Sequence, residues 1–376
     1  MKKIAILTFH RANNYGAVLQ AHALSCMIRK LGLDAQVLDY RPADMESFYH
    51  SPIPRTRNFK IFIILLIHRY LRDIATYRRF AAFRRENMHI SPETYRTSRD
   101  LTAANDIYDT FIAGSDQIWN PDIVKVQGKG ADHSYFLDFV IDASKKKSYA
   151  ASMGVSALSE DICTLYRDKL HDFATITVRE HKAAELLKSL LGRAIKTVCD
   201  PVLLMTEKEW EQYEHPYELP CKDYVLVYAV GGGRDLLPYA SRLAAEKNCT
   251  LYAIQPPIVG AVSRSRKQRL TGVGPSEFVW LIRHAQAVVT TSFHGSAFSL
   301  LFRKELHVMQ EDKAKENNRN SRFDSLFQYF GIQDESMEDR QFNERQVKVA
   351  SPDAGNKVIF ETNQTIAREI LRSLCN

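Results

Sequence analysis

The chain has 376 residues, of which 45% are hydrophobic and 25% charged, a composition typical of globular proteins and a length sufficient for two domains. Its six cysteines form no C-x-x-C pair and show no histidine spacing typical of zinc, so we expect reduced thiols in a cytoplasmic protein, without a metal site. No run of about 18 apolar residues occurs, and no membrane-spanning helix is therefore expected.

The net charge of +7 is concentrated in one segment. Between Arg55 and Arg85 there are nine basic residues and a single acid, Asp73. One interpretation is a helix with a solvated basic face. Because the segment also contains the apolar run 61–67, a second interpretation is an amphipathic helix in peripheral contact with an anionic membrane, at its inner face. We expect no nucleic-acid partner.

The N-terminal half alternates strands and helices. Residues 3–10 read as an apolar strand, 17–31 have the apolar spacing of a helix, and 35–40 read as a second strand. This β-α-β start predicts a parallel sheet with helices on its faces. A basic helical insertion follows at about 55–90. Further short strands are predicted at 110–113, 148–150, 175–178 and 196–199. Together these elements predict a Rossmann-like domain over residues 1–215.

The alternation restarts after a linker around 216–223. Strands are predicted at 224–230, 251–254 and 287–290, and helices from Arg234, at 275–284 and from about Gly295. These elements predict a second Rossmann-like domain over residues 222–350. Residues 357–376 predict a terminal helix that crosses back to the first domain. The predicted fold class is α/β, with two Rossmann-like doubly wound domains facing a cleft, as in GT-B glycosyltransferases.

The loop that contains His294 is the first candidate site. In open parallel sheets, ligands bind beyond the carboxyl ends of strands, where helix N-termini direct free N–H groups outward. His294 follows an apolar strand and opens a helix, so it is a candidate general acid or anion ligand. The alternative is a histidine that caps or packs at the turn. The same loop supplies Ser292, Gly295 and Ser296 as candidate anion-binding residues.

Two arginines are candidate anion ligands. Arg179 ends a predicted strand and could donate two forked hydrogen bonds to a carboxylate or phosphate. Its alternative is an ion pair with Glu180 or another acid. Arg234 follows three glycines, which allow close approach of a phosphate to the backbone, although the spacing fits neither G-x-G-x-x-G nor a P-loop.

Other polar residues follow strands of the first domain. Asp116 offers a carboxylate near an aromatic ring, a combination found in sugar sites, and its alternative is a helix cap. Its neighbours Ser115, Gln117 and Trp119 are grouped with it. Asp200, before Pro201, is interpreted as a turn residue. The first β-α turn adds three candidates for binding acceptor hydroxyls, although Asn-x-Gly also makes turns: Asn14, Tyr15 and Gly16.

Taken in order, these loops resemble the polysaccharide pyruvyl transferase family. The resemblance extends from about residue 4 to 326. The motifs that carry it are Asn14-Tyr15-Gly16-Ala17-Val18-Leu19-Gln20, Gly114-Ser115-Asp116-Gln117-Ile118-Trp119-Asn120, Tyr149-Ala150-Ala151-Ser152-Met153-Gly154, Val178-Arg179-Glu180, Asp200-Pro201 and Ser292-Phe293-His294-Gly295.

The resemblance implies a GT-B-like fold and formation of a pyruvate ketal from phosphoenolpyruvate, which serves as co-substrate without a cofactor or an obligatory metal. It also implies a functional histidine at His294 and a functional arginine at Arg179. Several family members carry an arginine two residues before the histidine, where this chain has Ser292. The missing cation would then be supplied by another residue: Arg234, Arg319 or Arg322.

The implied acceptor is a sugar of a cell-surface polysaccharide or of its lipid-linked oligosaccharide precursor. The first domain, with Asp116, would bind this acceptor, and the second domain would bind the donor. A rival interpretation is a GT-B glycosyltransferase that uses a nucleotide sugar, for which Glu277 is the nearest candidate ribose ligand. A third interpretation, from another class, is a non-catalytic protein that binds membrane or nucleic acid through the basic segment.

Overall fold

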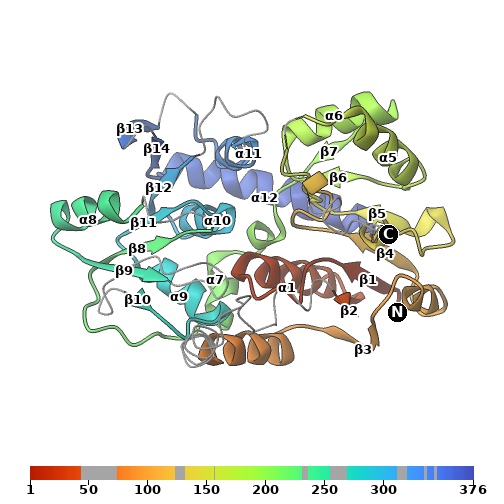
Figure 1. Cartoon of the computed structure of the whole chain (residues 1–376), viewed down its shortest axis with the longest axis horizontal. Coiled ribbons are helices and arrows are strands. Elements are labelled where there is room, and N and C mark those ends of the chain that lie inside the picture. Colours follow the sequence, from red (N-terminus) through yellow and green to blue (C-terminus); the bar gives the residue numbers. More distant parts are fainter. Residues whose placement is uncertain are drawn as a thin grey trace, which may run out of the picture.

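The computed structural model describes residues 1–43, 74–122, 132–155, 157–230, 236–254, 269–310, 320–333, 337–342 and 345–376. Two sheets, each with helices packed against it, lie side by side and form two α/β domains (Figure 1). The predicted fold class is thus confirmed.

The first domain is built on a five-stranded parallel sheet. Its strands are β1 (Lys3–Leu7), β2 (Asp34–Tyr40), β3 (Ile90–Tyr95), β4 (Thr110–Ala113) and β5 (Lys146–Ser148). They are ordered β3-β2-β1-β4-β5. The central strand β1 is apolar and buried, as a strand with neighbours on both sides requires. Helix α1 (Tyr15–Arg29) follows β1 and is buried along most of its length.

The rest of the first domain extends this sheet. It comprises α5 (Glu160–Leu170), β6 (Thr177–Val178), α6 (His181–Leu191), β7 (Lys196–Thr197), the 3₁₀ helix Pro201–Leu204 and α7 (Glu207–Trp210). Strand β6 pairs with β7 and joins the main sheet through a bridge between Val178 and Ala151. The residues that follow β6 and β7 therefore lie near those that follow β4.

The second domain repeats the strand order of the first. Its strands are β8 (Tyr224–Tyr228), β9 (Thr250–Ile254), β10 (Arg269–Leu270), β11 (Ala287–Thr290), β12 (Glu305–Met309), β13 (Glu338–Phe342) and β14 (Arg345–Ala350). The order is β10-β9-β8-β11-β12-β14-β13, parallel except for β14 and β13. Its helices are α8 (Leu236–Glu246), α9 (Pro275–His284), α10 (Phe293–Leu301) and α11 (Ser321–Tyr329).

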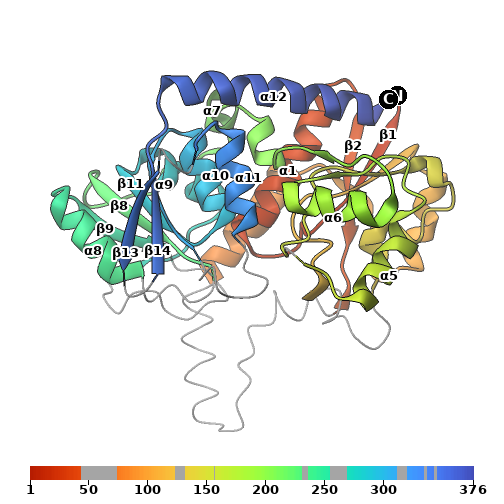
Figure 2. The same ribbon diagram turned by 90° about the horizontal axis from the view of Figure 1, so that it is seen from above.

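Helix α12 (Ala354–Cys375) runs along both domains (Figure 2). The Gln364 side chain donates to the carbonyl of Leu203 in the first domain. At the C-terminal end of α12, the ammonium groups of Lys2 and Lys147 donate to carbonyls of the last turn. Cations at this end complement the helix dipole and satisfy carbonyls that have no partner within the helix.

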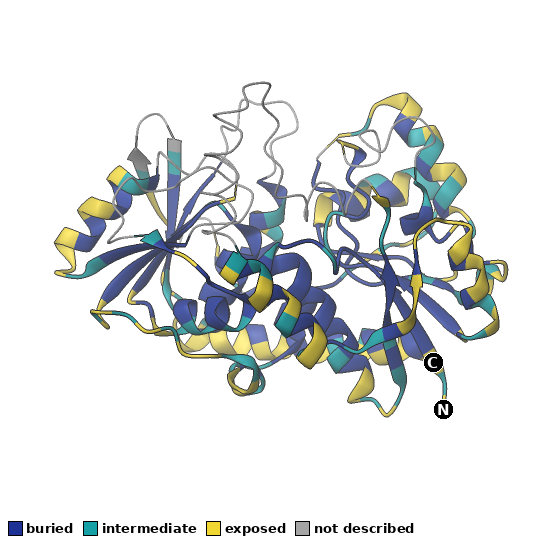
Figure 3. Ribbon diagram, turned by 60° about the horizontal axis from the view of Figure 1, so that its bottom comes forward, coloured by how far each residue is buried: buried dark blue, intermediate teal, exposed yellow. Residues whose placement is uncertain are grey.

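Buried residues fill both sheets and the helices between them (Figure 3). One core cluster includes residues of both domains, among them Tyr15 of α1 and Phe278 of α9, whose rings stack with centroids 4.5 Å apart. The hydroxyl of Tyr15 donates to the carbonyl of Val273 in the second domain. The two domains are therefore joined by a packed apolar interface.

Part of the predicted basic insertion is a helix at 74–87, and residues 55–73 lie outside the described part of the chain. Arg79 donates to the carbonyl of Gly272 in the second domain, and Arg84 donates to Asn13 in the first. These two cations contact protein groups, which differs from the solvated basic face predicted for the segment. Among the described residues, no helix is long and apolar enough to cross a bilayer.

Candidate functional site at the domain interface

The candidate residues follow strands at corresponding places of the two sheets. In the first sheet the order reverses beside β1 and β4, and in the second beside β8 and β11. Open α/β sheets bind ligands at such switch points, beyond the carboxyl ends of the strands. Residues after β1, β4, β6, β7 and β11 meet here, which brings together Gly16, Ser115, Arg179, Asp200 and His294.

His294 stands in the first turn of α10. Ser292 caps this helix, its hydroxyl accepting the N–H of Gly295 at 3.2 Å. The imidazole points across the interface onto α1, where a Cβ placed on Gly16 would lie 2.0 Å from Nδ1. Only glycine leaves room for the ring, so Gly16 contributes space rather than a ligand group.

Asp200 is the centre of the cluster. Its side chain is 0% exposed, and Oδ2 accepts a hydrogen bond from Nη1 of Arg179 at 2.8 Å and from Oγ of Ser115 at 3.2 Å. Oδ1 accepts the N–H of Val202, which caps the 3₁₀ helix. Nε2 of His294 lies 3.4 Å from Oδ2, within ion-pair distance but not aligned as a hydrogen bond. The turn role predicted for Asp200 is thus only part of its function in the structure.

Arg179 is held by acids and by an aromatic ring. Besides Asp200, its guanidinium donates to Oγ of Ser152 at 2.9 Å and lies 3.5 Å from the carboxylate of Glu180. Its carbon Cζ is 4.1 Å from the ring centroid of Phe293. The ion pair with Glu180 was the alternative to anion binding, and with a side chain that is 2% exposed Arg179 serves this structural role. Binding of a donor anion by Arg179 stays a prediction.

The charged groups of the cluster shift one another's pKa values. Burial opposes ionisation of Asp200, but His294 and Arg179 outweigh it and hold the pKa of this carboxyl well below its usual range. Burial likewise opposes the charge of Arg179, but Glu180 and Asp200 outweigh it and raise its pKa. Two carboxylates, those of Asp200 and Glu180, lie within ion-pair distance of this one guanidinium.

The residues grouped with Asp116 have different settings. Trp119 is 0% exposed, stacks on Phe136 and donates to the carbonyl of Tyr135, so it belongs to the core and is not a surface platform for a sugar. Ser115 is also buried, while Gln117 is partly exposed and accepts from Asn120. Asp116 is partly exposed with φ of 71°, a backbone conformation that is costly for a non-glycine residue and frequent at functional sites.

At the first β-α turn, Asn14 caps α1 through the N–H of Ala17, and Tyr15 is buried in the domain interface. Both therefore have structural roles, and acceptor binding by this turn stays a prediction. Among the proposed substitutes for the family arginine, Arg234 and Arg319 lie outside the described residues.

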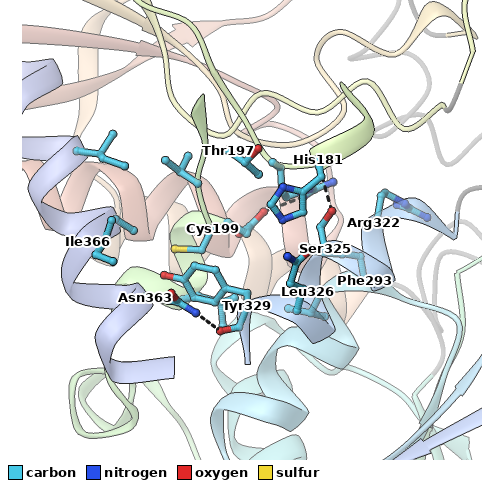
Figure 4. A pocket seen from close by; sticks show the side chains of 17 residues that line it. His181, Thr197, Cys199, Phe293, Arg322, Ser325, Leu326, Tyr329, Asn363 and Ile366 are labelled. Atoms are coloured by element: carbon cyan, nitrogen blue, oxygen red, sulfur yellow. Dashed lines mark hydrogen bonds and ion pairs between the residues drawn. The ribbon is translucent and has the colours of Figure 1, made fainter. Parts of the chain in front are cut away.

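Arg322 lines a cavity of about 380 Å³ that Arg179 and Asp200 also border (Figure 4). The cavity lies between α6, α11 and α12, and Cys199, Tyr329 and Ile366 line it as well. Burial raises the pKa of the Cys199 thiol to about 12, so this cysteine is a neutral lining group at physiological pH. Within the described residues, no group of three or more His, Cys, Asp or Glu could hold a metal ion.

The sequence matches the family model for polysaccharide pyruvyl transferase over residues 14–312. No curated protein matched. The UDP-GlcNAc 2-epimerase of Methanocaldococcus jannaschii, solved with UDP-GlcNAc and UDP, is 12% identical, with 99% of this chain and 100% of that chain covered and a TM-score of 0.44. A putative UDP-N-acetylglucosamine 2-epimerase of Listeria monocytogenes is 10% identical, with 100% of this chain and 90% of that chain covered and a TM-score of 0.48. A glycosyltransferase of Rickettsia africae is 12% identical, with 99% of this chain and 98% of that chain covered and a TM-score of 0.40.

The match to the family model covers most of the chain, including the loops that carry Gly16, Arg179, Asp200 and His294, and the chain therefore belongs to the polysaccharide pyruvyl transferase family.

Proposed function

We propose that the protein transfers a pyruvyl group from phosphoenolpyruvate to a pair of sugar hydroxyls, forming a pyruvate ketal on a cell-surface polysaccharide or its lipid-linked precursor. The observation that carries the proposal is the meeting of His294 with Arg179 and Asp200 between the domains. A cytoplasmic location, at the inner face of the membrane when the acceptor is lipid-linked, belongs to the same proposal.

The surroundings of His294 suit a small anionic donor. The first turns of α1 and α10 meet at the contact of Gly16 with His294. Helix N-termini carry partial positive charge and unpaired N–H groups, so two of them meeting at one site favour a carboxylate or a phosphate. Phosphoenolpyruvate has both groups, and it has no base or ribose that would need a larger site.

The reaction requires one proton to move to carbon and one to the leaving group. Protonation of the methylene carbon of phosphoenolpyruvate makes the adjacent carbon electrophilic, and a sugar hydroxyl adds there. The C–O bond to phosphate then breaks, and the second hydroxyl closes the ketal. The two hydroxyl protons balance the one gained by the methyl group and the one carried away by phosphate. His294 in its imidazolium form is the proposed proton donor.

Asp116 is the proposed acceptor ligand. Its partly exposed carboxylate follows β4, the strand next to β1 in the first sheet, on the same edge as the His294 cluster. A carboxylate there could accept hydrogen bonds from sugar hydroxyls and take up their protons.

The setting of Glu277 argues against the nucleotide-sugar alternative. Its carboxylate accepts the N–H of Gly274 at 2.9 Å, lies 3.4 Å from Arg79 and is nearly buried. Glu277 therefore caps α9 and binds the helix at 74–87, and it is not presented to a ribose.

Phosphate release in the presence of phosphoenolpyruvate and a glycan acceptor tests the proposal. We expect His294→Ala and Arg179→Ala each to lower turnover by about 100-fold or more, because His294 is the proposed proton donor and Arg179 holds the carboxylate beside it. His284→Ala, at an exposed histidine stacked on Trp280, is the matched control and should keep wild-type turnover. Unchanged phosphate release in the His294 variant would remove its role as proton donor.

A further inference from the structure

We infer that Asp200 is a positioning residue that orients the His294 imidazole and stabilises its protonated form; for the reaction, this inference rests on the proposed function. The carboxylate is not exposed to solvent, since its side chain is 0% exposed. It acts on the reaction through His294 of the second domain, whose Nε2 lies 3.4 Å from Oδ2.

The direction of the carboxylate supports this role. Two donors restrain it fully, Arg179 on Oδ2 and the N–H of Val202 on Oδ1, and the Ser115 hydroxyl, which also donates to the carbonyl of Ala150, lies 3.2 Å from Oδ2. These donors come from different parts of the first domain, so the carboxylate cannot rotate without losing at least one of them. A restrained carboxylate 3.4 Å from Nε2 provides a fixed reference for the imidazole of His294.

The other side of the ring is restrained as well. Nδ1 faces the backbone of Gly16, where a Cβ would lie at 2.0 Å. The ring also meets the Phe293 ring edge to face, with centroids 5.2 Å apart. With Nε2 toward Asp200 and Nδ1 against Gly16, the ring is restrained on both sides.

Charge balance gives the second reason. Asp200 and Glu180 are both buried acids, and Arg179 is the buried cation that contacts them. Buried charges are stable only when they are paired. The His294 imidazole is the second potential cation within ion-pair distance of Asp200, at 3.4 Å. The charged group in contact with the ring is Asp200 after β7. Glu180 after β6 and Asp116 after β4 act on Arg179, which in turn holds Asp200.

Titration of the histidine ring signals by NMR tests the inference without any substrate, with the His294 signal assigned from its loss in His294→Asn. In Asp200→Asn the titration midpoint of His294 should fall by about one pH unit or more relative to wild type, because an opposite charge within a few ångström has gone. Glu180→Gln is the matched control: it removes a buried carboxylate that contacts Arg179 but not His294, and should shift the midpoint by less than about half a unit. Equal midpoints in wild type and Asp200→Asn would overturn the inference.

Asp200→Asn also leaves the Arg179 guanidinium with one carboxylate fewer and could fail to fold. In that case Arg179→Leu is compared with the double variant Arg179→Leu, Asp200→Asn, which has no orphaned guanidinium. The midpoint of His294 should again be lower in the variant that lacks Asp200, and equal midpoints would contradict the inference.

Turnover separates this inference from the proposed function. If wild-type protein releases phosphate from phosphoenolpyruvate, Asp200→Asn should reduce turnover about 100-fold and move the alkaline limb of the pH profile to lower pH. A full pH profile identical to wild type would overturn the positioning role. If wild-type protein releases no phosphate while the NMR midpoints differ as expected, the donor assignment fails and the role of Asp200 toward His294 stands.

Discussion

Helices α1 and α10 begin with the same local structure in different domains. Each has a polar N-cap whose side chain accepts the N–H group three residues later, Asn14 for Ala17 and Ser292 for Gly295. An aromatic residue occupies the first helical position of both. The capping pattern positions the next side chain in the same way on each helix.

The second helical position distinguishes them. Gly16 of α1 provides space, and His294 of α10 fills that space with a titratable ring. The aromatic residues differ too, since Tyr15 joins the domain interface whereas Phe293 supports the guanidinium of Arg179. The two helix starts therefore have different roles. The start of α1 fixes the relative position of the domains, and the start of α10 supplies the imidazole of His294.

The largest expected effect concerns stability. Tyr15→Ala should lower the free energy of unfolding by about 3–5 kcal/mol, because it removes a buried ring that stacks on Phe278 and contacts the second domain. Chemical denaturation measures this loss. A loss below about 1 kcal/mol would show that α1 does not fix the interface, and the division between the two helices would be wrong.

The pH dependence of stability tests the buried setting of His22, the histidine within α1. His22 of α1 is packed among Phe83, Trp210 and Tyr213, and burial lowers its pKa to about 4. The unfolded chain takes up this proton near pH 6.5 but the folded chain does not, so stability falls as the pH drops from about 6.5 to 4, by about 3 kcal/mol for this group.

His22→Gln should remove that part of the pH dependence, as measured by denaturation at pH 7, 5.5 and 4. Other groups titrate in both proteins. The comparison therefore uses the difference between the variant and the wild type in the slope of unfolding free energy against pH. Equal slopes in the variant and the wild type would contradict the burial of a neutral His22.

The next largest effect is expected on turnover, from a substitution at Gly16. Gly16→Ala places a methyl group where the imidazole of His294 lies and should reduce turnover about 100-fold, equivalent to about 2.7 kcal/mol, since a displacement of about 1 Å at a reacting group has effects of this size. Gly355→Ala, in the first turn of α12, is the control with the same substitution and should keep wild-type activity. Full activity in Gly16→Ala would mean that His294 does not act from its present position.

The helix caps give the smallest effects. Asn14→Ala and Ser292→Ala should each cost about 1 kcal/mol of stability, because an N–H group loses its acceptor. Asn14→Ser should restore the cap. If Asn14→Ser recovers stability but loses turnover, the side chain binds the acceptor as predicted from the sequence; if both recover, its role is the cap alone.

Local patterns in the sequence were sufficient for much of the fold. The predicted strand at 110–113 coincides with β4, and the predictions at 3–10 and 35–40 overlap β1 and β2. Strand β3 was missed, since its sequence ISPETY lacks apolar alternation and contains a proline, which is tolerated here because β3 is an edge strand. The hairpin of β13 and β14 was missed because its strands are rich in charged residues.

For the site, position after a strand was enough to single out His294 and Arg179, but not to find how they are held. Asp200 was in the same set of strand-end residues, and its aspartate-proline pair indicated only a turn. Its partners Arg179 and Ser115 are 21 and 85 residues away, and His294 belongs to the other domain. The contacts with Arg179 and Ser115 depend on strand pairing within the first domain, and the contact with His294 depends on the docking of the second, and no local pattern encodes either. The burial of Trp119 was also missed, because it depends on packing within the first domain against Phe136 and Phe173.

The central claim is that the site between α1 and α10 binds phosphoenolpyruvate, and calorimetric titration tests it most directly. Wild-type protein, in the presence of an acceptor glycan, should bind phosphoenolpyruvate saturably, and His294→Ala should weaken that binding, while a panel of UDP-sugars gives no binding heat. Saturable binding of a UDP-sugar, with none of phosphoenolpyruvate, would contradict the claim and favour a glycosyltransferase.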